Sequence, residues 1–180
     1  HVYKTPFEIS KSMAVQAWSF KKSVNPGFVT HRAYDIFDTQ TNGLNFEYFE
    51  GKWSKIPDFS KLKPARKGKV NGFALQHINM KEDYWGVRFK GFIQIPQDGL
   101  YSFSTISDDG SRLFVNNQKV IDNDGVHGPF TVHGKIELKK GKYPLMLDYF
   151  EGNYGELLRV EMEGPGMLKQ SLPISLLLFE

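Results

Sequence analysis

The sequence contains no cysteine, which excludes disulfide bonds and thiolate chemistry. It also has no apolar run long enough to cross a membrane as a helix, because the most apolar stretch, residues 176–179, has only the length of a strand. The formal net charge is +3, and lysines are spread along the chain. A nucleic-acid-binding face needs clustered Lys and Arg, so nucleic acid is not expected as a partner. The one lysine-rich run, residues 61–69, contains Pro64 and Gly68 and is predicted to be a solvated loop.

Recognisable catalytic motifs are also missing. A glycosidase needs two carboxylates facing each other across a cleft, and an acyl transferase needs a nucleophile with a histidine partner. The acidic residues and the five histidines stand in no acid/base motif and at no metal-ligand spacing. We therefore expect this chain to be non-catalytic, although turnover of an aryl glycoside by the purified protein would revive an enzymatic interpretation.

What the sequence does contain is a series of short strands. Alternating apolar and polar residues between glycine-rich and asparagine-rich turns predict strands at 44–50, 84–95, 100–106, 111–115, 118–122, 130–138, 142–150 and 156–162. No apolar period of 3.6 residues survives the glycines and prolines, so long helices are not expected. The pattern predicts an all-β antiparallel sandwich. The segment 54–83 is predicted to be a long loop, and such loops on sandwiches often carry recognition.

The polar segment after the third of these strands is the strongest candidate for chemistry. Asp108 and Asp109 are adjacent carboxylates at a strand end and are followed by Gly110. Calcium prefers several hard oxygen ligands in a flexible shell, which two such carboxylates can begin to supply. Asp, Gly and Ser also build ordinary turns at strand ends, so a purely structural turn is the alternative.

This chain resembles the PA-14 domain, the protective-antigen-like β-sandwich of bacterial toxins, glycosidases and fungal flocculins. The matching motifs hold their order over about four-fifths of the chain: Gly43-Leu44, Tyr48-Phe49-Glu50-Gly51, residues 87–96, residues 107–113, Gly125, His127, residues 138–143 and Tyr149-Phe150-Glu151-Gly152. The resemblance implies a PA-14 β-sandwich over residues 39–180. The chain departs from the family pattern at Asp124, where an aromatic residue is usual, and at Asn116-Asn117, where Asp-Gly is usual.

The resemblance also implies a binding site. In the flocculin branch the matching aspartates are joined by a cis peptide and hold calcium, which in turn binds sugar hydroxyls. It therefore implies Ca²⁺ at Asp108 and Asp109, and a sugar site made of these two residues with Asn123, Asn153 and Tyr154. From the residues alone, the loops that carry the last three are equally compatible with plain polar turns.

Residues 1–38 resemble a different protein. Tyr3-x-x-Pro6-Phe7 followed by Val15-x-Ala17 is similar to the last strands of the Ig-like domain that closes chitobiases and bacterial β-hexosaminidases. Together with the start of the chain in mid-pattern, this predicts the C-terminal part of a bacterial β-N-acetylhexosaminidase or related glycoside hydrolase, located in the periplasm or at the cell surface.

On this interpretation the chain is an accessory module, and two roles remain open for it. In the first it binds a glycan, containing N-acetylglucosamine or another complex polysaccharide, with an upstream catalytic domain as its neighbour. In the alternative it is a structural or interaction module that packs on that catalytic domain or mediates dimerisation, with no ligand of its own. An exposed aromatic side chain beside the aspartate pair favours the first role.

Overall fold

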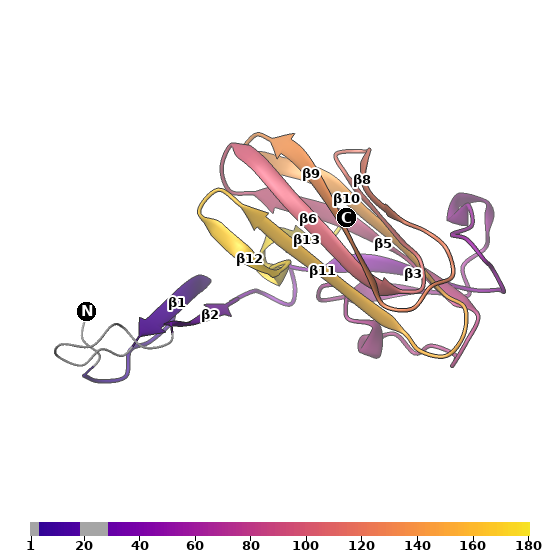
Figure 1. Cartoon of the computed structure of the whole chain (residues 1–180), viewed down its shortest axis with the longest axis horizontal. Helices are drawn as coiled ribbons and strands as arrows, with labels where there is room; N and C mark the ends of the chain where they lie inside the picture. The colour runs from indigo at the N-terminus through magenta and orange to yellow at the C-terminus, as the bar shows by residue number, and fades with distance from the viewer. Residues whose placement is uncertain (1–3, 19–28) are drawn as a thin grey trace.

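The computed structural model describes residues 4–18 and 29–180 and is an all-β protein with antiparallel sheets, as the sequence predicts (Figure 1). The larger sheet has the order β4 (Arg66–Val70), β3 (Leu44–Glu50), β5 (Trp85–Ile95), β10 (Gly141–Glu151), β7 (Ser111–Val115) and β8 (Gln118–Asn123), and β13 (Leu177–Leu178) pairs with β5. The smaller sheet has the order β12 (Met167–Ser171), β11 (Leu157–Gly164), β6 (Gly99–Asp108) and β9 (Phe130–Leu138). Short 3-10 helices cover Phe59–Lys61 (η1), Leu75–His77 (η2) and Ile174–Leu176 (η3). In the described part of the chain no helix has the length and apolar character needed to cross a membrane.

The eight predicted strands of the sandwich are all present, with ends that differ by at most a few residues. The prediction for residues 54–83 is wrong in one respect, because β4 lies within this segment and forms the edge of the larger sheet beside β3. Pro64, Gly68 and the lysines made this strand look like a solvated loop. Lysine-rich edge strands are common because charged side chains discourage pairing with another chain.

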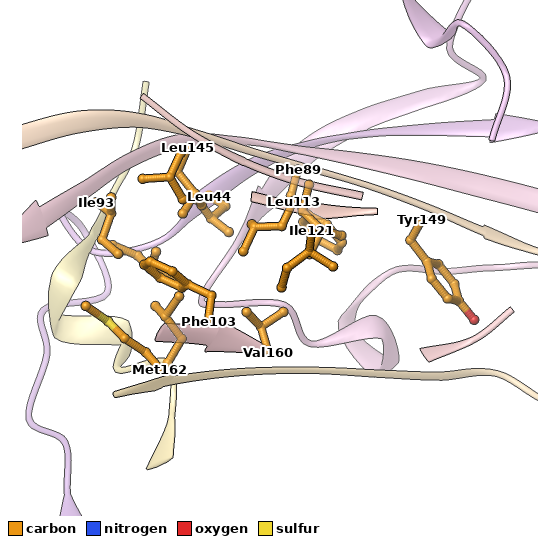
Figure 2. Close-up of a cluster of buried hydrophobic side chains, with 14 of the residues drawn as sticks. Leu44, Phe89, Ile93, Phe103, Leu113, Ile121, Leu145, Tyr149, Val160 and Met162 are labelled. Atoms are coloured by element: carbon orange, nitrogen blue, oxygen red, sulfur yellow. The ribbon is translucent and has the colours of Figure 1, made fainter. Parts of the chain in front are cut away.

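The core lies between the two sheets and follows from the alternation of side chains along each strand. Figure 2 shows Phe89, Leu113 and Leu145 of the larger sheet facing Phe103 and Val160 of the smaller one. Most of these side chains are fully buried, so apolar burial at about 25 cal/mol per Å² is the main stabilising contribution to the fold.

The turns between these strands follow local residue chemistry. Asn116 and Asn117 connect β7 and β8 with φ angles of 53° and 61°. Asparagine tolerates this left-handed region better than most residues, so the two-residue hairpin loop forms without the Asp-Gly pair that the family usually has there. The departure from the family pattern therefore leaves the turn in place.

A separate hairpin precedes the sandwich. Strands β1 (Met13–Trp18) and β2 (Val29–Tyr34) pair with each other, and within the described ranges they add no strand to either sheet (Figure 1). Asp35 connects the hairpin to the sandwich, because its Oδ2 accepts the backbone N–H groups of Ile174 at 2.5 Å and Ser175 at 3.2 Å. The turn predicted at residues 24–27 lies outside the described residues, and the Ig-like character of residues 1–38 stays a prediction.

Candidate functional site

The aspartate pair lies where the chain passes from one sheet to the other. Strand β6 of the smaller sheet ends at Asp108, and β7 of the larger sheet begins at Ser111. Buried hydroxyls hold this crossing: Ser111 Oγ lies 2.8 Å from Ser107 Oγ and donates to Thr105 Oγ1 at 3.0 Å. The polar residues at the strand end therefore connect the two sheets by hydrogen bonds, and these bonds position the two carboxylates.

Asp108 and Asp109 are joined by a cis peptide bond, and Glu151 stands beside them. One carboxylate oxygen from each of the three residues lies within 4.8 Å of the others. Asp109 is 2% exposed, and its carboxylate is fixed by two backbone N–H groups, from His127 to Oδ1 at 2.8 Å and from Gly152 to Oδ2 at 2.7 Å. These two hydrogen bonds fix the orientation of the Asp109 carboxylate.

Glu151 was missed in the sequence analysis. It is the last residue of β10 and is 0% exposed. Its Oε2 accepts a hydrogen bond from the Tyr149 hydroxyl at 3.0 Å, whereas its Oε1 is buried without a hydrogen-bond partner among the described residues. A sequence signal existed, because Glu151 continues the inward alternation of Leu145, Leu147 and Tyr149 and is the charged residue at its end.

When no cation is present, the electrostatics of the cluster favour the protonated forms of Glu151 and Asp108. Burial raises the pKa of Glu151 to about 8; the hydrogen bond from Tyr149 opposes this rise, and the charges of Asp109 and Asp108 add to it. Burial, and then the charge of Asp109, also raise the pKa of Asp108. Three carboxylates in so small a space repel one another, and a cation between them would relieve this repulsion.

The residues of the cluster fit a calcium ion. All three side chains offer hard oxygen ligands, and Ca²⁺ is bound by six to eight oxygens in a flexible shell. A buried carboxylate oxygen with no partner is costly, since buried polar groups are normally hydrogen-bonded or bound to a metal. Glu151 Oε1 is such an atom, and it belongs to the cluster that already contains two aspartates.

The other sequence-predicted site residues fall into two places. Asn123 is 5% exposed, and its Nδ2 donates to Ser107 Oγ at 2.9 Å and to the carbonyl of Phe130 at 3.2 Å. Its amide nitrogen therefore supports the sheet crossing. Asn153 and Tyr154 lie on the loop directly after Glu151 and Gly152, with Asn153 half-buried and Tyr154 99% exposed. The structure thus has an exposed aromatic residue on the loop that directly follows Glu151.

Asp124, the unusual acidic residue, does not join this cluster. Its Oδ1 accepts the backbone N–H of Ile56 at 2.6 Å, and its Oδ2 accepts a hydrogen bond from Arg112 at 2.6 Å. Ile56 belongs to a satellite cluster with Phe59, Phe49 and Phe150. Asp124 therefore fastens the loop that covers Phe150, the neighbour of Glu151.

Gly152 is required at the site because of a close approach. A Cβ at this position would lie 2.8 Å from Asp109 Oδ2. We expect Gly152→Ala to displace the Asp109 carboxylate and to weaken calcium binding, measured by isothermal titration calorimetry, by about tenfold, equivalent to about 1.4 kcal/mol. Gly155→Ala is the matched control, because a Cβ there meets nothing within 4 Å. Equal affinities for the two variants would contradict the positioning role of Gly152.

Comparison with known proteins agrees with this architecture. The PA14 domain family model matches residues 40–171. A PA14 sugar-binding domain from an RTX adhesin has the same fold, with a TM-score of 0.63 at 18% identity over 77% of this chain and 99% of that one. At this identity the likeness concerns the fold alone.

More similar sequences belong to another class of protein. The anti-sigma-I factor RsgI3 of Acetivibrio thermocellus is 32% identical over 118 residues, which are 64% of this chain and 18% of that protein. An anti-sigma factor domain-containing protein from Clostridium clariflavum gives a TM-score of 0.63 at 26% identity, covering 89% of this chain and 58% of that one. The chain thus spans less than a fifth of the curated relative and somewhat more than half of the solved one.

These relatives correct the functional prediction. The assignment to the end of a β-N-acetylhexosaminidase or related glycoside hydrolase is wrong, because the relatives at 32% and 26% identity are anti-sigma factor proteins. The alternative role, in which the chain packs on the catalytic domain of that hydrolase, is corrected by the same finding. The error arose from a short motif in residues 1–38 and from the assumption that a module keeps one kind of neighbour, whereas one fold serves many functions. The family model covers well over half of the chain, and the chain therefore belongs to the PA14 domain family.

Proposed function

We propose that this PA14 domain binds carbohydrate through a calcium ion held by Asp108, Asp109 and Glu151. The observation that carries the proposal is the buried Oε1 of Glu151, which has no hydrogen-bond partner in the described residues and belongs to a cluster of three carboxylates. The sugar-binding domain of the RTX adhesin, which has this fold, supports the choice of carbohydrate as the ligand class.

Calcium, when bound, would supply coordination positions for sugar hydroxyls, since it takes more oxygen ligands than the three side chains provide. The chain itself would supply the aromatic surface. Tyr154 is almost fully exposed beside Asn153, and its backbone N–H lies 3.4 Å from Asp83 Oδ1. Tyr84, next to Asp83, is 37% exposed. Lys52 lies over the Tyr84 ring, with its Nζ 4.8 Å from the ring centroid, so Tyr154 is the tyrosine whose ring is open to a ligand. A tyrosine ring presents an apolar face and a polar hydroxyl to such a ligand.

The protein around this domain differs from the one first predicted. We place the domain in a regulatory protein of the anti-sigma-factor type, where glycan binding would provide the input signal. A glycan ligand favours a location outside the bacterial cytoplasm, where extended polysaccharides are found. The periplasm or cell surface therefore remains the proposed location, now for a signalling protein.

A glycan array probed with calcium and with EGTA tests the proposal. The array includes N-acetylglucosamine-containing disaccharides and plant and bacterial polysaccharides. We expect binding in calcium that is lost in EGTA and lost in Glu151→Gln, which keeps the size of the side chain but removes its charge. Glu156→Gln is the matched control, because Glu156 is an exposed carboxylate in the same loop. Binding that is equal in EGTA, or no binding by a protein that takes up calcium, would overturn the proposal.

A further inference from the structure

The Tyr149 hydroxyl connects two of the three residues of the cluster. It is hydrogen-bonded to the backbone carbonyl of Asp108 and lies 3.0 Å from Glu151 Oε2. The side chain is 0% exposed, and Figure 2 shows it at one end of the core cluster, with its hydroxyl pointing away from its own strand. The contact therefore joins β10 of the larger sheet to the end of β6 in the smaller one.

This contact determines which oxygen of Glu151 is free. With Oε2 held by Tyr149, only Oε1 is left without a partner in the described part of the protein. Once Glu151 is ionised, as cation binding requires, the two aspartates repel it, and a carboxylate free to rotate would turn away from them. The hydrogen bond from the Tyr149 hydroxyl to Oε2 opposes this rotation.

We propose that Tyr149 is a positioning residue for the cation, which holds the Glu151 carboxylate and the Asp108 carbonyl in place before the ion arrives. The inference rests on the proposed calcium site. Groups that hold metal ligands in this way contribute to affinity without touching the metal, and their loss typically weakens binding about 10–100-fold. The ring itself packs against Trp85 with centroids 5.4 Å apart, so a phenylalanine preserves the packing and removes only the hydroxyl.

Terbium luminescence tests the inference in the whole chain. Tb³⁺ replaces Ca²⁺ at oxygen sites, and Trp85, whose ring centroid lies 5.4 Å from that of Tyr149, remains as an energy donor in every variant. We expect Tyr149→Phe to bind Tb³⁺ about 10–100-fold more weakly than the wild type, with a shorter luminescence lifetime because water replaces the misplaced carboxylate. Tyr101→Phe is the matched control: it removes another buried hydroxyl, which donates to the Gln97 carbonyl at 2.8 Å, at the other end of β6.

A second measurement separates positioning from general destabilisation. If Tyr149 acts through Glu151, adding Tyr149→Phe to Glu151→Gln should weaken Tb³⁺ binding much less than it does in the wild type, because coupled residues are not additive. Wild-type affinity and lifetime in Tyr149→Phe, equal losses in both tyrosine variants, or full additivity would overturn the inference. If the wild-type chain binds no Tb³⁺ or Ca²⁺, the calcium site and this inference both fail. If it binds the ion but no glycan, only the proposed function fails.

Discussion

Millimolar calcium is expected to raise the melting temperature of this protein by about 5–10 °C. A ligand at one hundred times its dissociation constant adds about 2.7 kcal/mol to the free energy of unfolding, and each kcal/mol shifts a domain of this size by about 2–4 °C. The physical source is that Asp108, Asp109 and Glu151 come together only in the folded protein, so that the ion binds the folded state and not the unfolded chain. Differential scanning fluorimetry in calcium and in EGTA measures the shift.

Two variants and a second metal sharpen this experiment. Glu151→Gln and Asp109→Ala should lose most of the calcium-dependent shift, whereas Glu156→Gln should keep it. Magnesium should give a smaller shift, because it demands near-ideal octahedral geometry and gives up its water reluctantly. A melting temperature that does not respond to calcium would show that the three carboxylates serve the fold alone.

The second expected result concerns pH in the absence of calcium. The pKa of Glu151 is about 8 in the folded protein and is ordinary, near 4.5, in the unfolded chain. A carboxyl group whose pKa is raised by folding contributes stability that is full below pH 4.5 and is lost as the pH rises through 8. The melting temperature in EGTA should therefore fall between pH 5 and pH 9, and the raised pKa of Asp108 acts in the same direction.

Glu151→Gln isolates this effect, because it cannot ionise. Its melting temperature in EGTA should match the wild type near pH 5 and exceed it at pH 9. Calcium affinity should change in the opposite sense, rising from pH 5 to pH 8 in the wild type, because the ion displaces the proton of Glu151. Parallel pH profiles for the two proteins would mean that Glu151 is already ionised in the folded state. Groups that the fold makes more acidic, such as Asp122 and Glu161, titrate below this window.

Much of the fold could be predicted from local chemistry. Strand alternation and turn residues identified the eight sandwich strands, because both properties are set by near neighbours. The strand β4 was missed, since an edge strand gains its pairing from β3 and needs few apolar residues of its own. Strand β12 was missed for the same reason, as it lies at the edge of the smaller sheet beside β11.

Only part of the candidate site could be predicted from the sequence. Asp108 and Asp109 could be located at a strand end because they are adjacent in the sequence. Glu151 lies more than 40 residues away, and its role depends on β10 ending level with the passage from β6 to β7, which is a property of the pairing between strands. Asn123 is the opposite case, a residue that was predicted from the sequence and has a structural contact. It was predicted to bind sugar, and its amide nitrogen donates to Ser107 Oγ at the end of β6.

The amino-acid sequence alone therefore determined the class of fold, the family and one pair of acidic residues, because these depend on residue types and on spacing along the chain. The tertiary structure decided which carboxylate faces the pair, which of its oxygens is left without a partner and which hydroxyl holds it. Those features arise from contacts between residues distant in sequence, such as Tyr149 with Asp108 and Gly152 with Asp109. Local patterns carry no information about such contacts until the two sheets are packed together.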